Sequence, residues 1–287
     1  MRCAFIAGCG YIGIRIARLW REAGREVSCL VRSPEKSQKL REQGFQSVAV
    51  SFDEQEIPVP DLSASIICYL VPPPGGGNAD TRARNFVNAM KGSGTPAQII
   101  YMSATSVYSE TAGGVVTEES PTEPASAMGK RRLDAEAAFL EYGVANGVPV
   151  TILRVSGIYG PGRLPVMQIS QGQPLLREDE SGPSNRIHAD DLAAVCVAAA
   201  EKSEAGGIYN VSDGHPGSMT SYFNACADLL GHPRQPQVTR EEARLVMSPL
   251  MLSYVTESRI VDNTRMLNDL GIRLTYPAMA EGLQACR

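Results

Sequence analysis

The chain has 287 residues, of which 43% are hydrophobic and 20% are charged, and its formal net charge is -4. This composition excludes a disordered chain and supplies enough apolar side chains for a hydrophobic core. Roughly 100–200 residues per domain allows one large domain or two small ones. A mildly acidic chain without a block of Lys and Arg is a poor candidate for binding nucleic acid or an anionic membrane surface.

No segment reaches the roughly 18–20 consecutive apolar residues that a membrane span requires. The apolar run at residues 3–7 is too short for a signal peptide and leads directly into glycines. The seven cysteines are scattered and include no CxxC pair, which favours a reducing compartment and argues against a disulfide framework or a zinc site. We therefore expect a cytoplasmic protein that acts on a small-molecule substrate, without a nucleic-acid or membrane partner.

The first half of the chain alternates short apolar runs with helical patterns. The apolar runs predict strands at residues 3–7, 26–31, 47–50, 65–71 and 98–102, and the helical patterns are clearest at 14–23, 33–43 and 81–91. Continuous apolar runs are typical of parallel strands that are buried on both faces. The alternation therefore predicts a parallel sheet with helices on both sides.

The composition changes after a further apolar run at residues 150–155. Residues 160–165 and 171–184 are rich in Gly, Pro and polar side chains, residues 190–200 predict an Ala-rich helix, and residues 207–211 predict one more strand. Helical patterns follow at 221–230, 240–247 and 264–270. We predict an α/β protein with a Rossmann-type doubly wound parallel sheet in residues 1–160, to which a strand near 207–212 returns, and a smaller substrate-binding region in 161–287.

Residues 8–13 read GCGYIG, a GxGxxG motif between a predicted strand and a predicted helix, which is the context that supports dinucleotide binding. Gly8 permits a tight turn, Gly10 lets the backbone approach a pyrophosphate, and Gly13 lets the helix pack closely on the strand. The free N–H groups and the positive end of the helix then attract the phosphates. We predict that these glycines, with Tyr11 and Ile12 between them, bind a dinucleotide.

The end of the second predicted strand indicates which dinucleotide is bound. NAD enzymes usually carry Asp or Glu at this place for the ribose 2′-hydroxyl, whereas this chain has Arg32 and Ser33. A guanidinium can pair with a 2′-phosphate, so we predict NADP(H) rather than NAD, although Arg32 as an ordinary surface residue would leave the choice open. Asp53, after the third strand, is either a contact on the adenine side or an unrelated loop carboxylate.

Several segments, in the same order along nearly the whole chain, resemble the extended short-chain dehydrogenases/reductases, the NAD-dependent epimerase/dehydratase family. They are the glycine turn, IYMSATSVY at 100–108, LRVSGIYGPGR at 153–163, RIHADDL at 186–192 and YNV at 209–211. The late segments at 209–214 and 262–276 look most similar to the atypical YeeZ-like branch. The resemblance implies an NAD(P)-binding Rossmann fold with a small C-terminal substrate domain. It also implies cofactor contacts from Val71, Ser103, Arg132, Ser156 and Ile158.

The resemblance further implies a catalytic Ser or Thr and a YxxxK array, in which the Tyr transfers a proton and the Lys lowers the pKa of that Tyr. This chain departs from the family at each place. Ala104 stands at the Ser/Thr position, Met128 at the Tyr position and Arg132 at the Lys position. Met cannot transfer a proton, and Arg remains charged at any working pH. The family mechanism therefore cannot be transferred unchanged.

Other residues in the same segments are candidates for the missing chemistry. Ser103 and Thr105 flank Ala104, and Tyr108 follows closely, so we predict these three as catalytic residues. Tyr11 and Tyr159 are further phenols in cleft-forming motifs, for which packing is the alternative role. His188 fits a structural position at a helix start. Glu118, Glu119 and Glu123 fall in a loop that we expect to be solvated.

Two departures weaken a nucleotide-sugar substrate. Such enzymes often have Asn where this chain has Gly157, and Arg where it has Ser184. Arg154, Arg163 and Arg186 remain as candidate anion-binding groups, with a buried ion pair as the alternative for Arg154.

Three functions therefore stay open. The first is an NADP(H)-dependent oxidoreductase or epimerase-like enzyme that acts on a small carbonyl or alcohol with a non-standard proton donor. The second is an NADP(H)-binding redox sensor without turnover, and the third is a nucleotide-sugar epimerase. A homodimer is compatible with the sequence, although no motif requires one.

Overall fold

The computed structural model describes residues 3–202 and 206–287 of the chain. Within that part, a seven-stranded sheet has the order β12-β7-β5-β4-β1-β2-β3, and every neighbouring pair in it is parallel. Its strands are β1 (Ala4–Ala7), β2 (Val27–Val31), β3 (Gln46–Ala49), β4 (Ile66–Tyr69), β5 (Gln98–Ala104), β7 (Val150–Val155) and β12 (Gly207–Val211). The prediction of a doubly wound parallel sheet is confirmed.

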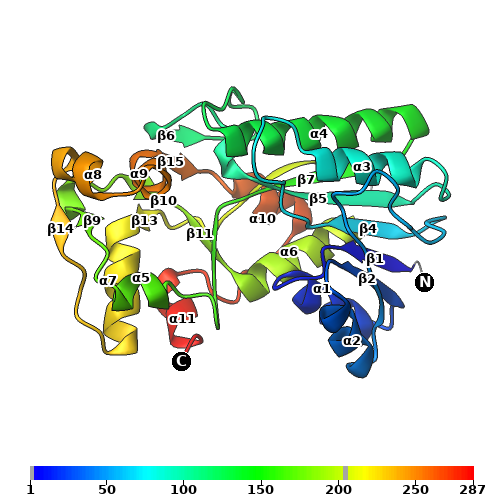
Figure 1. Cartoon of the computed structure of the whole chain (residues 1–287), viewed down its shortest axis with the longest axis horizontal. Coiled ribbons are helices and arrows are strands. Elements are labelled where there is room, and N and C mark those ends of the chain that lie inside the picture. The colour runs from blue at the N-terminus through cyan, green and yellow to red at the C-terminus, as the bar shows by residue number, and fades with distance from the viewer. Residues whose placement is uncertain (1–2, 203–205) are drawn as a thin grey trace.

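Helices cover both faces of this sheet (Figure 1). On one face lie α1 (Gly13–Glu22), α2 (Pro34–Glu42), α6 (Ala189–Lys202) and α10 (Thr264–Leu270), and on the other lie α3 (Thr81–Met90) and α4 (Ala127–Asn146). The helices on each face bury their apolar side chains in a shared core, so the sheet has one core on each side. Trp20 of α1, for example, is fully buried in the first core, and Phe86 of α3 and Phe139 of α4 are fully buried in the second. None of the described helices is long and apolar enough to cross a membrane.

A smaller region extends beyond the carboxyl edge of the sheet (Figure 1, left). Its helices are α5 (Val166–Ser170), α7 (Met219–Leu230), α8 (Arg240–Val246), α9 (Pro249–Thr256) and α11 (Met279–Gln284). They pack with two-stranded pairs formed by β8 (Gly157–Tyr159) with β11 (Arg186–His188), β9 (Leu175–Leu176) with β14 (Gln237–Val238), β10 (Pro183–Ser184) with β13 (Gly217–Ser218), and β6 (Ala112–Val116) with β15 (Ser258–Val261). The β8–β11 pair leads from the sheet into this region, because β8 follows β7 after a single residue.

The long helix α4 was not singled out by the sequence patterns, although its ends carry clear signals. The Ser126 hydroxyl accepts a hydrogen bond from the Gly129 amide at the start of the helix, and Gly147 ends it with a left-handed φ of 64°. Its first turn lies very close to the short helix η1 (Thr105–Val107), since a Cβ on Gly129 would be 2.2 Å from the carbonyl oxygen of Ser106.

We expect Gly129→Ala to destabilise the fold by about 1–3 kcal/mol, the usual cost of overpacking. The added methyl group would also meet Pro124 Cβ at 2.5 Å, so either the helix or η1 must move. Chemical denaturation measures the change in the free energy of unfolding. Gly92→Ala is the matched control because no atom lies within 4 Å of the added Cβ. Equal midpoints for the two variants would contradict the close contact.

Candidate functional site

The turn between β1 and α1 is held against β4 by contacts that tolerate no side chain. Gly8 has a φ of 84°, and a Cβ on it would lie 2.9 Å from the amide nitrogen of Val71. A Cβ on Gly13 would be 3.2 Å from both the Gly8 carbonyl oxygen and Ile6 Cγ2. Gly10 differs, because its nearest neighbours would be 3.7 Å or more away. The turn is therefore packed tightly against the protein at Gly8 and Gly13 and open at Gly10, where a pyrophosphate would approach.

The start of α1 lies at the glycine turn and carries no acidic side chain of its own. In the described structure α1 has no side-chain cap and no acidic residue in its first turn. The positive end of the helix is therefore not neutralised from within the chain, which suits a phosphate group.

A pocket at this edge of the sheet brings together the residues predicted for the cofactor's adenosine half. It is lined by Gly8, Cys9, Gly10, Val31, Arg32, Ser33, Lys36, Phe52, Asp53, Val71, Pro72 and Arg82. Residues from the ends of β1, β2 and β4 thus meet at one place, as expected for the carboxyl edge of a doubly wound sheet.

The pocket contains a cation that the sequence reading missed. Lys36 lies in the first turn of α2, and its Nζ is 3.9 Å from the position that a Cβ on Gly10 would take. The Ser33 hydroxyl caps the same helix by accepting a hydrogen bond from the Lys36 amide at 3.3 Å. Because this cap fixes where α2 begins, it also fixes the place of Lys36. A basic residue four positions after the predicted Arg32 was the available signal.

Asp53 lines the pocket but is already paired. Arg82 Nε donates to Asp53 Oδ1 at 2.6 Å and Arg82 Nη2 donates to Oδ2 at 2.9 Å. This pair lowers the pKa of Asp53. The carboxylate is therefore held beside Arg82, and the exposed Arg32 and Lys36 remain as cations for a ligand.

Three further residues predicted for the cofactor lie on two elements, Ser156 and Ile158 after β7 and Arg132 on α4. Ser156 is buried, its amide donates to the Val211 carbonyl oxygen at 3.0 Å, and its hydroxyl has no partner in the described structure. Ile158 is half-buried in β8. Arg132, in the second turn of α4, donates from Nη1 to the Met102 carbonyl oxygen at 2.8 Å. It thus reaches the end of β5.

The register of three strands builds a buried polar network at the end of β5. Ser103 of β5 pairs with Arg154 of β7, which pairs with Asn210 of β12, so the three residues lie side by side across the sheet. Glu136 of α4 reaches this row: Ser103 Oγ donates to Glu136 Oε1 at 2.5 Å, and Arg154 Nη2 lies 2.8 Å from Glu136 Oε2. The two charged side chains are 5% and 3% exposed. Arg154 is therefore a buried ion-pair residue, the alternative that the sequence left open.

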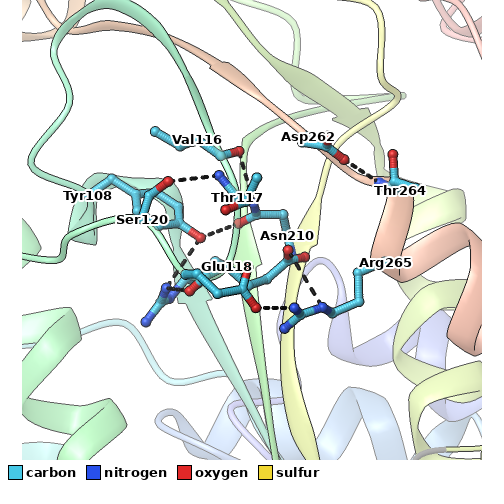
Figure 2. Close-up of polar contacts among 11 residues, drawn as sticks. Tyr108, Val116, Thr117, Glu118, Ser120, Asn210, Asp262, Thr264 and Arg265 are labelled. Atoms are coloured by element: carbon cyan, nitrogen blue, oxygen red, sulfur yellow. Dashed lines mark hydrogen bonds and ion pairs between the residues drawn. The ribbon is translucent and has the colours of Figure 1, made fainter.

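Tyr108 belongs to the same network (Figure 2). Its hydroxyl donates to Asn210 Oδ1 at 2.5 Å and accepts from Arg154 Nη1 at 3.2 Å, and the ring is 1% exposed. Burial raises the pKa of the Tyr108 phenol. A buried phenol that is bonded on both sides is poorly placed to reach a substrate, so the geometry does not favour its predicted catalytic role.

Glu118 also joins the network, and here the expectation of a solvated loop is wrong. Its Oε1 accepts from the Asn210 amide at 2.8 Å, and its Oε2 lies 3.8 Å from Arg265 Nε (Figure 2). The Glu118 side chain is only 5% exposed, whereas that of the neighbouring Glu119 is 65% exposed. Nothing in the local sequence distinguishes the two residues, because the partners of Glu118 come from β12 and α10.

Thr105 follows Ala104, which stands at the expected Ser/Thr position, and Met128 stands at the expected Tyr position. Thr105 is half-buried, and its carbonyl oxygen accepts from Arg259 Nη1 at 2.9 Å. Met128 is 40% exposed at the start of α4. Tyr159 and His188 are fully buried and stack edge to face with ring centroids 5.3 Å apart, so His188 has the structural position that the sequence predicted.

The comparisons with known proteins agree with this arrangement. Residues 81–212 match the profile of a family described as NAD dependent epimerase/dehydratase. Protein YeeZ of Escherichia coli K12 is 25% identical over 96% of this chain and 97% of its own length. A functionally unknown conserved protein from Silicibacter pomeroyi is 26% identical, with a TM-score of 0.83 over 100% of this chain and 98% of that one. MoeE5, solved with UDP-glucose and NAD, has a TM-score of 0.77 over 99% and 97% of the two chains, but at 20% identity it shows the fold alone.

We expect Glu136→Ala to lower the free energy of unfolding by about 3–5 kcal/mol, because Arg154 would keep a buried charge without its partner. Denaturant titration followed by circular dichroism measures the change. Asp228→Ala removes one partner of the exposed pair Arg234–Asp228 and should leave the midpoint almost unchanged. If both variants behaved alike, the ion pair would not be the buried support that we describe.

Proposed function

Because this chain carries a domain of the NAD-dependent epimerase/dehydratase family, we propose that it is an NADP(H)-binding oxidoreductase that acts on a small carbonyl or alcohol. The observation that carries this proposal is the pocket at the carboxyl edge of the sheet. It combines an open glycine turn, a helix start without an acidic side chain and two exposed cations, Arg32 and Lys36.

The two cations support the phosphorylated coenzyme. Arg32 directly follows β2, where an NAD enzyme usually carries a carboxylate. Asp53, the carboxylate that lines the pocket, is held by Arg82. A 2′-phosphate adds about two negative charges, which a guanidinium and an ammonium can bind through charge-assisted hydrogen bonds.

Two residues near the end of β5 are proposed to serve the reaction. The bound nicotinamide would supply the hydride chemistry. Thr105 has a hydroxyl without a hydrogen-bond partner among the described residues, and its backbone is fixed by Arg259, so we assign it to the substrate oxygen. Arg132 uses Nη1 for contacts to Met102 and Tyr101, and its remaining donors are assigned to the ribose. Ser103 and Tyr108 support this edge from within the buried network rather than through contact with substrate.

Arg32→Ala and Lys36→Ala should each weaken NADPH binding roughly tenfold or more, because a hydrogen bond to a charged group contributes about 1.5–3 kcal/mol. NADH binding should change little in Arg32→Ala, whereas Lys36, whose Nζ lies beside Gly10, can also contact the pyrophosphate that both coenzymes share. Isothermal titration calorimetry gives the Kd values for both coenzymes. Lys39→Ala, which removes the same charge from an exposed position on the same helix outside the pocket, is the control. Equal losses for NADPH and NADH in Arg32→Ala would contradict a 2′-phosphate site.

A second candidate, a redox sensor that binds NADP(H) without turnover, is favoured by the engaged hydroxyls of Ser103 and Tyr108 and by Met128 at the tyrosine position. Turnover separates the two candidates. For an oxidoreductase we expect carbonyl-dependent NADPH oxidation, measured at 340 nm, to fall in Thr105→Val while the Kd for NADPH is unchanged. Tight NADPH binding without oxidation by any member of a broad carbonyl panel would leave only the sensor.

A further inference from the structure

The three arginines that the sequence singles out as anion-binding candidates differ in their surroundings. Arg154 is paired with Glu136 inside the sheet. Arg163 lies over the ring of Tyr11, 5.3 Å from its centroid. Arg186 has no carboxylate within ion-pair distance in the described structure, and it begins β11 at the point where the chain enters the smaller region.

The guanidinium of Arg186 fills the space that a side chain at position 157 would take, because residue 157 is a glycine. Arg186 pairs in register with Gly157 of β8, and a Cβ on Gly157 would lie 2.9 Å from Arg186 Nη1. Gly157 itself is exposed. It stands between Ser156 and Ile158, the two residues of this segment that we assign to the cofactor. The guanidinium therefore lies beside the backbone predicted to border the nicotinamide.

The surroundings of Arg186 are largely apolar. Its guanidinium carbon lies 3.6 Å from the centroid of the Tyr222 ring, and Nη2 is 3.3 Å from Met219 Sδ. Burial lowers the pKa of Arg186 from its usual value. The residue as a whole is half-buried, and its guanidinium is the most enclosed part of it. A desolvated guanidinium that has no carboxylate within ion-pair distance in the described structure is an unfavourable arrangement that a bound anion would relieve.

We propose that Arg186, positioned by Gly157 and Tyr222, binds a carboxylate carried by the substrate. This inference rests on the proposed oxidoreductase function and narrows its substrate class to small carbonyl or hydroxy acids. The local charge favours a single negative charge over a diphosphate. Arg186 is the cation here, and Asp213 lies near it with Oδ1 bonded to the His215 amide at 3.0 Å. The other titratable neighbours are Tyr159, Tyr222 and Cys226.

Asp213 limits how much anionic charge the site can accept. Burial raises the pKa of Asp213 to about 6, so at pH 7 most of its population still carries a negative charge. The negative charge of Asp213 lowers the positive potential at Arg186. Little positive potential therefore remains for a doubly charged ligand. A monocarboxylate placed against the Arg186 fork can still form two parallel hydrogen bonds.

The test measures binding of acetate and acetoacetate to the full chain, with and without saturating NADP+, by calorimetry and thermal shift. Acetoacetamide is the neutral analogue, and inorganic phosphate and UDP-glucose are the competing anions. We expect saturable binding of acetoacetate that weakens at least about tenfold in Arg186→Met. The same loss is expected in Gly157→Ala, which keeps the charge and displaces the guanidinium. Arg244→Met, at an exposed position on α8, should bind as the parent does.

Three outcomes would overturn the carboxylate site. They are no saturable binding of either carboxylate, equal affinity for acetoacetate in the parent and in Arg186→Met, or phosphate or UDP-glucose binding more tightly than acetoacetate through Arg186. A normal response to NADP+ in the same titrations would show that only this inference has failed. Loss of NADP+ binding in the parent protein would instead remove the proposed function.

Discussion

The predicted cofactor site at the β1–α1 turn depends on one backbone contact, in which Gly8 approaches Val71 just after β4. At Gly8 the chain has a left-handed φ and passes within contact distance of the Val71 amide. Any other L-residue would be strained there and would also push the two strands apart. Because this contact sets where β1 ends, it sets where α1 begins and where its amide groups point. The pocket with Arg32 and Lys36 forms around that same edge.

The second organising feature is the buried network behind the cleft. In-register pairing of β5, β7 and β12 aligns Ser103, Arg154 and Asn210, and Glu136 from α4 supplies the negative charge. Charged groups in such a position are stable only when each has its partner. The hydroxyls of Ser103 and Tyr108 are thereby committed to the fold, and Ala104 and Met128 offer no replacement. The glycine turn is thus well formed, whereas the polar groups at the end of β5 differ from those that the family resemblance implies.

The sequence predicted what local patterns determine. Buried parallel strands appear as apolar runs, so the sheet was predicted correctly. The glycine motif lies at the β1–α1 turn, between the strand and the helix that the sequence predicted, and cofactor binding there stays a prediction. The ends of elements were less accurate: β4 is Ile66–Tyr69 where residues 65–71 were expected, and β5 continues to Ala104 beyond the expected residue 102. Partners that are distant in sequence could not be foreseen. Glu118 is buried because Asn210 and Arg265 fold against it, and Arg186 stacks on Tyr222 from the distant helix α7.

A crystal structure with NADP+ tests the central claim most directly. The account predicts the pyrophosphate at the glycine turn over Gly10 and the 2′-phosphate within hydrogen-bond distance of Arg32 or Lys36. A coenzyme bound with its adenosine ribose away from both cations, or a crystal soaked at saturating NADP+ that shows no coenzyme at the glycine turn, would contradict it.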